Sequence, residues 1–247
     1  MRVALISDIH GNEIALEAVL AEIDHERVDV TYCLGDIAPL GSKPRETIDM
    51  IRSRGLRCVM GNHDEFLLEP DLIRSYSTVP LVAEGVDWCR AELSPADLDF
   101  LRNFEREIDV PLGDGATLRL FHGSPRSHME MILATTPADD LDTMLDGRRA
   151  TVLAGGHTHV QMLRQHRGQL VVNVGSVGMP FEEHVGAGPV KTAPPKVLDH
   201  AEYALIHAAR GRVHVELRRV PLDRGKLYQA AVASTNPLRG MLAAQYS

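Results

Sequence analysis

The chain has 247 residues, of which 44% are hydrophobic and 24% are charged, and these values are typical of a folded globular protein rather than a disordered one. Its formal net charge of −8 argues against a nucleic-acid-binding surface, because such surfaces neutralise phosphates with clustered lysine and arginine. The first apolar run is too short for a signal-peptide core and no run reaches the roughly 18 residues of a membrane span, so we expect a cytoplasmic protein without membrane contact.

The first sixty residues alternate between short apolar runs and helical patterns. Strands are expected at residues 2–7, 28–34 and 56–60. Helices are expected at residues 12–26 and 44–54. This alternation predicts right-handed βαβ crossovers and a parallel sheet, and ligands bind at the edge of such a sheet where its strands end.

The middle of the chain is expected to be helical first and to return to strands later. Residues 65–104 are predicted to be helical, with one helix at 79–93 and another opened by a capping box at 94–97. Further strands are expected at residues 117–121 and 151–154, with a helix at 138–146 between them.

The last third is predicted to contain two hairpins, a long loop and a C-terminal helix. The hairpins are expected at 160–165 with 169–174 and at 201–208 with 212–220. Residues 175–199 are predicted to be a loop near the site, and residues 223–247 one short helix with a fraying tail. We therefore expect a domain at 1–222 and a C-terminal helix and tail at 223–247. The odd number of cysteines and the lack of a C-x-x-C spacing predict reduced, mostly buried thiols.

Polar side chains that can bind metals follow five of the predicted strands. These motifs are Asp8-Ile9-His10, Gly35-Asp36, Gly61-Asn62-His63-Asp64, His122-Gly123 and Gly156-His157-Thr158-His159. Taken alone, Asp8 or Asp36 could cap a helix, and His157 and His159 could lie on alternate faces of a strand end. Neither alternative explains why so many ligand-type residues are expected at one edge of the fold.

With D-x-H, G-D, G-N-H-D, H-G and G-H-x-H in this order, the sequence resembles the calcineurin-like metallophosphoesterase superfamily. The later segments 173–178 and 201–205 look like its compact bacterial phosphodiesterase branch, and the resemblance extends from residue 1 to about residue 222. It implies an α/β fold in which two mixed sheets form a β-sandwich flanked by helices, a four-layer αββα arrangement.

The resemblance also implies a ligand set for two divalent ions. One ion is expected to be held by Asp8, His10 and His159. The other is expected to be held by Asn62, His122 and His157. Asp36 is expected to bridge them, since two cations about 3.5–4 Å apart need a shared anionic ligand. Nitrogen and oxygen ligands without thiolate suit transition metals better than Ca²⁺ or Mg²⁺, so we expect manganese first, with iron, zinc, nickel or cobalt as alternatives.

The reaction implied is hydrolysis of a phosphoester by a metal-bridging hydroxide. His63 is expected to stabilise charge or to protonate the leaving oxygen. Asp64 would either orient His63 or stabilise the start of a helix. No acidic residue follows Asp36 within residues 37–41, where the family's protein phosphatases carry one, and this favours a small-molecule or nucleotide substrate over a protein.

Substrate contacts are expected from a few residues beside these motifs. Asn12 could bind a phosphate oxygen or cap the helix that follows it. Arg126 and His128 could reach a second phosphate or a base, or could lie in a solvated loop. The segment 181–200, with His184 and His200, departs from the pattern of this branch and is either a lid or a variable loop.

Two other functions remain open at this point. A nuclease is one, although aromatic residues make up only 4% of the chain and no basic stripe is visible. A non-catalytic protein-binding scaffold is the other, although every ligand position is filled. A homo-oligomer is not excluded, and we expect no nucleic-acid partner.

Overall fold

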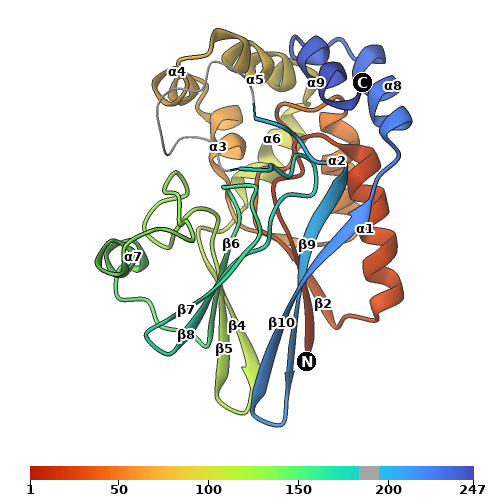
Figure 1. The fold of residues 1–247 in the computed structure, drawn as a ribbon. Helices are drawn as coiled ribbons and strands as arrows, with labels where there is room; N and C mark the ends of the chain where they lie inside the picture. The colour runs from red at the N-terminus through yellow and green to blue at the C-terminus, as the bar shows by residue number, and fades with distance from the viewer. Residues whose placement is uncertain (184–194) are drawn as a thin grey trace.

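The computed structural model describes residues 1–183 and 195–247 and contains two β-sheets packed face to face (Figure 1). The first sheet has the order β10-β9-β1-β2-β3 and contains β1 (Arg2–Ile6), β2 (Val30–Cys33), β3 (Arg57–Cys58), β9 (His200–Ala209) and β10 (Arg212–Pro221). The second has the order β4-β5-β6-β8-β7 and contains β4 (Ile108–Gly113), β5 (Ala116–Leu120), β6 (Val152–Gly155), β7 (Met162–His166) and β8 (Gln169–Asn173). Both sheets are mixed, as predicted.

The core follows from the alternation of side chains along each strand. In β1, Val3 and Leu5 point into the cluster between the two sheets, whereas Ala4 and Ile6 point into the cluster beneath the helices. Strand β1 is therefore buried on both faces, and it pairs in parallel with β2 and antiparallel with β9. This explains why its sequence is a continuous apolar run.

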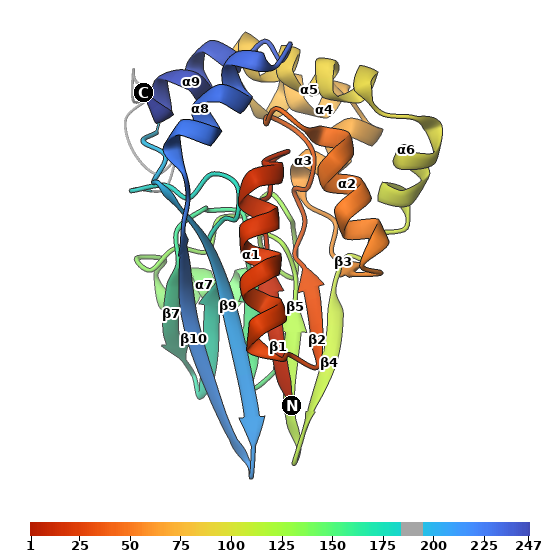
Figure 2. The same cartoon turned by 90° about the vertical axis from the view of Figure 1, so that its right-hand side faces the viewer.

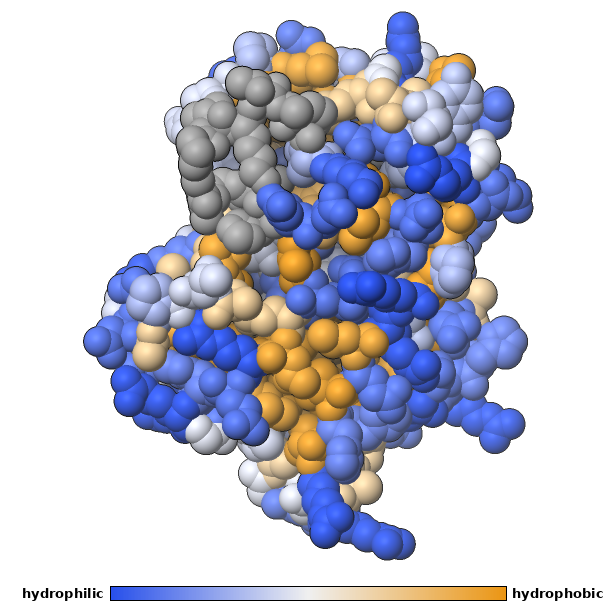
Figure 3. Space-filling model, viewed as in Figure 1, coloured by the Kyte–Doolittle hydropathy of each residue, from blue (hydrophilic) through white to orange (hydrophobic). Residues whose placement is uncertain are grey.

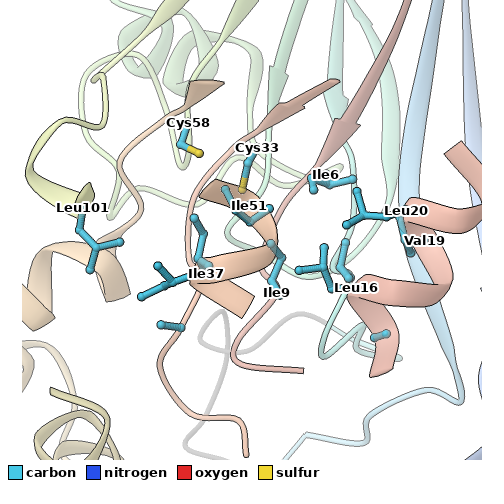
Figure 4. Close-up of a cluster of buried hydrophobic side chains, with 14 of the residues drawn as sticks. Ile6, Ile9, Leu16, Val19, Leu20, Cys33, Ile37, Ile51, Cys58 and Leu101 are labelled. Atoms are coloured by element: carbon cyan, nitrogen blue, oxygen red, sulfur yellow. The ribbon is translucent and has the colours of Figure 1, made fainter. Parts of the chain in front are cut away.

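Helices cover both outer faces of the sandwich. Helix α1 (Glu13–Glu26) and helix α2 (Pro44–Ser53) lie on the first sheet (Figure 2), with side chains from α1, α2 and the strands meeting in one cluster (Figure 4). Helix α7 (Ala138–Leu145) packs on the second sheet through Leu141 and Leu145. The four-layer αββα arrangement is thus confirmed. Cys33, Cys58 and Cys89 are free and buried, as predicted.

The remaining helices form a cap at the end of the sandwich where the parallel strands finish (Figure 2). They are α3 (Asn62–Leu68), α4 (Asp71–Tyr76), α5 (Pro80–Glu92), α6 (Pro95–Arg102), α8 (Arg224–Ala233) and α9 (Arg239–Tyr246). The capping box predicted for the start of α6 is present, with Asp97 N–H bonded to Ser94 Oγ and Ser94 N–H bonded to the Asp97 carboxylate. No helix of the described ranges has the length and apolar character needed to cross a bilayer.

The prediction of one short helix with a fraying tail at the C-terminus is wrong. Helices α8 and α9 bury Leu227, Leu242 and Tyr246 in a cluster that also contains Met179. The turn between them is fixed by Asn236, whose amide Nδ2 donates to the carbonyl oxygens of Leu40 at 3.0 Å and Gly41 at 2.7 Å. The tail is ordered because these contacts to distant segments hold it, and none of them is visible in a local pattern.

Three other expectations need correction or a limit. Strand β4 was not predicted, since Pro111 interrupts its pattern, but the strand lies at a sheet edge, where proline is tolerated. The strand expected at 56–60 shortens to β3 because Val59 instead forms an isolated bridge with Glu105. Within the described parts of 175–199 the ordered pairing is one bridge between Phe181 and Val197.

The surface of the face seen in Figure 1 is mostly hydrophilic (Figure 3). An apolar area lies in its middle, over the open side of the sandwich between the two sheets. Val213, Val215 and Leu217 of β10 are partly buried and pack against the inter-sheet cluster.

Candidate metal centre

The candidate ligands converge at the cap end of the sandwich. Asp8 and His10 follow β1, Asp36 follows β2 and Asn62 begins α3. His122 follows β5 of the second sheet, and His157 and His159 follow β6. All seven side chains are buried. The site therefore draws on both sheets, whose parallel strands end at the same end of the molecule.

Two groups of three ligand-type side chains lie within this cluster, and each group has its ligand atoms within 4.8 Å of one another. They are Asp8 with His10 and His159, and Asp36 with His122 and His157. In the first group, His10 Nε2 lies 3.0 Å from His159 Nε2. Beside the second, Asn62 Oδ1 lies 3.0 Å from His122 Nε2. The structure thus brings together every residue that the sequence predicts as a ligand.

Backbone carbonyls fix the orientation of three of the imidazole rings. His10 Nδ1 donates to Pro39 O at 3.0 Å, His122 Nδ1 to Leu34 O at 2.6 Å and His159 Nδ1 to Met179 O at 2.7 Å. Since a carbonyl oxygen only accepts, each Nδ1 carries the proton. The Nε2 atom of each ring then points into the centre, which is the usual arrangement of histidine ligands.

Asp36 belongs to the second group and also lies close to the first. Its Oδ2 is 3.7 Å from His10 Nε2 on one side and 3.4 Å from His122 Nε2 on the other. Its Oδ1 accepts the backbone N–H of His63 at 2.8 Å. A carboxylate in this position faces both groups at once.

The backbone around the centre is held in an uncommon conformation. Five of the eleven non-glycine residues with positive φ in the described parts are candidate ligands: Asp8, His10, Asp36, His157 and His159, with φ between 48° and 69°. Such conformations cost energy and occur where a site requires them. Gly61 is also required, because a Cβ there would lie 2.1 Å from Asp36 Oδ1.

The charges of the centre favour bound cations. Burial alone would raise the pKa of Asp36, but His122 and His63 hold it well below its usual range. Burial opposes protonation of His122, yet Asp36 and Asp8 raise its pKa to about 10. Asp8 Oδ1 and His157 Nε2 are buried and have no hydrogen-bond partner among the described residues. Unpartnered acceptor atoms in a buried site fit the binding of positive ions.

His63 lies beside the centre without belonging to either group. Its ring makes edge contacts with His10 and Phe66, each at a centroid distance of 5.2 Å, and its Nδ1 has no partner within the described ranges. Burial lowers its pKa to about 3. The ring is therefore neutral near pH 7.

Asp64 holds the loops of the centre in place. Its carboxylate accepts the backbone N–H groups of Asp36 at 2.7 Å, Ile37 at 2.9 Å and Gly61 at 3.1 Å. Burial and the charge of Asp36 raise its pKa to about 7 in spite of these bonds. These contacts support the role at the start of a helix that the sequence left open, and none of them reaches the ring of His63.

The predicted substrate contacts are already engaged within the protein. Asn12 caps α1 through Oδ1, which accepts Ala15 N–H at 3.1 Å, and its Nδ2 donates to Gly178 O at 2.9 Å. Arg126 pairs with Glu130 on the surface. Asn12 thus acts as the helix cap that the sequence offered as an alternative.

His128 belongs to a small network that the sequence did not reveal. Its Nε2 lies 2.7 Å from Glu65 Oε2, and its Nδ1 lies 2.6 Å from Arg106 NH1. Arg106 and Glu65 are also paired at 2.9 Å. No motif marks Arg106, since it lies in the connection after α6.

The segment 181–200 contributes one unexpected contact. Phe181 stacks on the ring of His159 with centroids 4.4 Å apart and an interplanar angle of 17°. His200 Nε2 lies 3.2 Å from Glu202 Oε1 at the start of β9. His184 lies outside the described residues.

Comparisons with known proteins show which proteins this chain resembles. A family model described as the calcineurin-like phosphoesterase superfamily domain matches residues 1–192. An uncharacterized protein of Methanocaldococcus jannaschii is 26% identical over 95% of this chain and 93% of its own length. A symmetrical bis(5'-nucleosyl)-tetraphosphatase of Pectobacterium carotovorum is 30% identical over 105 residues, which span 37% of each protein.

Solved structures show the same fold. A metallophosphoesterase from Sphaerobacter thermophilus superposes with a TM-score of 0.73 and 25% identity, covering 100% of this chain and 98% of the other. A hypothetical protein from Pyrococcus horikoshii superposes with a TM-score of 0.80 and 19% identity, covering 98% and 96% of the two chains.

Proposed function

The chain belongs to the calcineurin-like phosphoesterase superfamily and is a phosphoric ester hydrolase, and from this premise we propose that it hydrolyses a small phosphoester at a centre of two divalent metal ions. The position of Asp36 supports this proposal most directly. Its carboxylate oxygen Oδ2 lies 3.7 Å from His10 Nε2 and 3.4 Å from His122 Nε2, so it offers an anionic ligand that two cations can share.

The protein's own residues would hold the ions in two sets. Asp8, His10 and His159 form one set, and Asn62, His122 and His157 form the other, with Asp36 common to both. When bound, two divalent ions lower the pKa of water and polarise phosphoryl oxygens. Manganese is the ion we propose first, since imidazole, amide and carboxylate ligands without thiolate suit a borderline cation.

His63 would interact with the phosphoryl group itself. Its neutral ring carries one N–H that can donate to a phosphoryl oxygen or to the leaving oxygen as negative charge develops there. Asp64 acts at a distance from the substrate, by fixing the backbone of the loops that carry Asp36 and Asn62. The left-handed conformations of the ligand loops keep this arrangement assembled before substrate arrives.

Nucleotides are the substrate class that we propose first. The name of the Pectobacterium relative refers to nucleoside polyphosphates, and its matching region spans 37% of that enzyme. The network of Arg106 and His128 beside α3 offers cationic and hydrogen-bonding groups near the second set of ligands, where a second phosphate could bind. We keep Arg126, His128 and Asn12 as candidate contacts that would exchange their present partners for substrate.

A hydrolysis screen tests this function. The purified protein is stripped of metal, reconstituted with Mn²⁺, Fe²⁺, Co²⁺, Ni²⁺ or Zn²⁺, and assayed on phosphomonoesters, phosphodiesters and dinucleoside polyphosphates. We expect turnover that depends on added metal and is fastest for a nucleotide. Metal-dependent turnover confined to long DNA would favour a nuclease, and turnover that is unaffected by metal removal would contradict the proposal.

A further inference from the structure

A line of aromatic rings leads from the candidate metal centre to the cap. His10 contacts His63 at a centroid distance of 5.2 Å, His63 contacts Phe66 at 5.2 Å, and Phe66 contacts Tyr76 at 5.3 Å. His63 and Phe66 lie on α3, three residues apart, so their rings share one face of the helix. Tyr76 is the last residue of α4, and its ring ends the line.

The hydroxyl of Tyr76 has no hydrogen-bond partner among the described residues. The residue is 38% exposed, and its hydroxyl makes no hydrogen bond to any part of the chain that the structure describes. Burial of the ring is the main cause that raises its pKa to about 12, and the charges of Asp36 and Asp8 raise it further. The line of ring contacts connects this phenol to the metal centre through Phe66 and His63, and at neutral pH the phenol is a hydrogen-bond donor.

The other tyrosines with a comparable pKa do not have this setting. Burial alone raises the pKa of Tyr246 to about 12. Burial is the main cause that raises the pKa of Tyr203 to about 12, and the charged residues that also affect this pKa, such as Arg218 and Glu22, lie outside the centre. The charges of Asp36 and Asp8 therefore contribute to the raised pKa of Tyr76 and are not among the causes for these two side chains.

We infer that Tyr76 is a substrate-contacting residue whose hydroxyl donates a hydrogen bond to a non-bridging phosphoryl oxygen of the bound ester. This inference rests on the proposed function. The contact with Phe66 sets the position of the phenol, and the side chain is partly exposed. A neutral donor suits this place, because it stabilises an anionic phosphoryl group without pairing with the carboxylates of the centre.

The variant Tyr76→Phe removes the hydroxyl and keeps the ring that packs on Phe66. Tyr228→Phe is the matched control, because Tyr228 is 37% exposed and lies on α8, on the opposite side of the cap from α4 (Figure 1). Binding of inorganic phosphate to the manganese-loaded proteins is measured by calorimetry, together with kcat/KM for a phosphoester from the screen. Elemental analysis reports the metal content of each protein.

We expect Tyr76→Phe to weaken phosphate binding and to lower kcat/KM by about 10- to 100-fold, the usual effect of losing a hydrogen bond to a charged group. Metal content should stay at the wild-type value, and Tyr228→Phe should match the wild type throughout. Wild-type phosphate affinity and kcat/KM in Tyr76→Phe would overturn the inference. Loss of metal would also overturn it, since Tyr76 would then act on the ion site.

Failure of the proposed function gives a different result. If the wild-type protein binds phosphate but hydrolyses no ester with any metal, the proposed function fails. Tyr76 is then judged from binding alone, where weakened binding in Tyr76→Phe supports the contact and unchanged binding refutes it. If the loaded wild-type protein does not bind phosphate, both proposals are wrong.

Discussion

Replacing Asp36 with asparagine should remove metal from both halves of the centre. The amide keeps the size of the side chain and an oxygen that can accept the N–H of His63, which Asp36 Oδ1 now accepts at 2.8 Å. The negative charge is lost. Asp36 Oδ2 lies 3.7 Å from His10 Nε2 and 3.4 Å from His122 Nε2, so the negative charge of Asp36 would attract a cation bound to either nitrogen.

The size of the effect follows from that proximity. One pair of unit charges about 4 Å apart interacts by about 4 kcal/mol at an effective dielectric constant of about 20. Each 1.4 kcal/mol corresponds to about a tenfold change in affinity, so loss of the Asp36 charge should weaken manganese binding by at least about 10³-fold. Turnover should fall below detection at metal concentrations that saturate the wild type.

Equilibrium dialysis with Mn²⁺ measures the number of ions per chain and their affinities. The control is Asp97→Asn, because Asp97 is also a buried carboxylate but bonds to Ser94 and Arg52 away from the centre. We expect two tight sites in the wild type and in Asp97→Asn, and weak binding at both sites in Asp36→Asn. Two ions of wild-type affinity in Asp36→Asn would refute the bridging role.

Three further predictions concern residues around the centre. His63→Asn should retain both metals and should lower kcat by a similar factor, about 10²–10⁴-fold, for alkyl and nitrophenyl esters, because the neutral ring of His63 donates a hydrogen bond to both kinds of substrate. A clearly smaller loss for nitrophenyl esters would show that His63 protonates the leaving oxygen. Asp97→Asn should lower the Tm at pH 7, and the difference in Tm from the wild type should shrink below about pH 4. Burial raises the pKa of the Asp97 carboxyl in the folded state, but Arg52 and Ser94 lower it further than burial raises it. The ionised carboxylate therefore stabilises the fold above the unfolded-state pKa, and this stabilisation is lost as the pH falls. A pH-independent difference would contradict this. Shortening the segment 181–200 outside Phe181 should change the ranking of substrates and leave metal content unchanged; loss of metal would show that His184 or His200 is a ligand.

The sequence predicts that the candidate ligands lie close together, because each of them is tied to a local signal. Asp8, Asp36 and His122 each lie just after an apolar run. Because parallel strands end at the same edge of a sheet, their topology brings residues at the strand ends together. Most of the strands and helices follow from periodicity, whereas the sandwich of two mixed sheets is implied by the resemblance to the family. The alternatives of a lone helix cap or of divergent strand ends do not account for the convergence that the structure has at this place.

The features that the sequence did not reveal depend on contacts between distant segments. Helices α8 and α9 are ordered by the contact of Asn236 with the loop at Leu40 and by burial against Met179. The stack of Phe181 on His159 and the pairing of Arg106 with Glu65 and His128 join segments with no shared motif. Strand β4 escaped detection because Pro111 is disfavoured in strands unless they lie at an edge, and edge position is decided by tertiary structure.

The position of Tyr76 illustrates the same limit at the level of function. Its sequence neighbours show only a short helix with an aromatic residue, which is most often a packing residue. Its relation to the centre arises from the packing of α4 on α3 through Phe66. Such a contact can be identified only once both helices are placed.

Anomalous diffraction from crystals of the manganese-loaded protein tests the binuclear centre most directly. We predict two anomalous peaks per chain about 3.5–4 Å apart, one bound by Asp8, His10 and His159 and the other by Asn62, His122 and His157, with Asp36 bound to both. A single peak at saturating manganese, or two peaks of which only one contacts Asp36, would contradict the account.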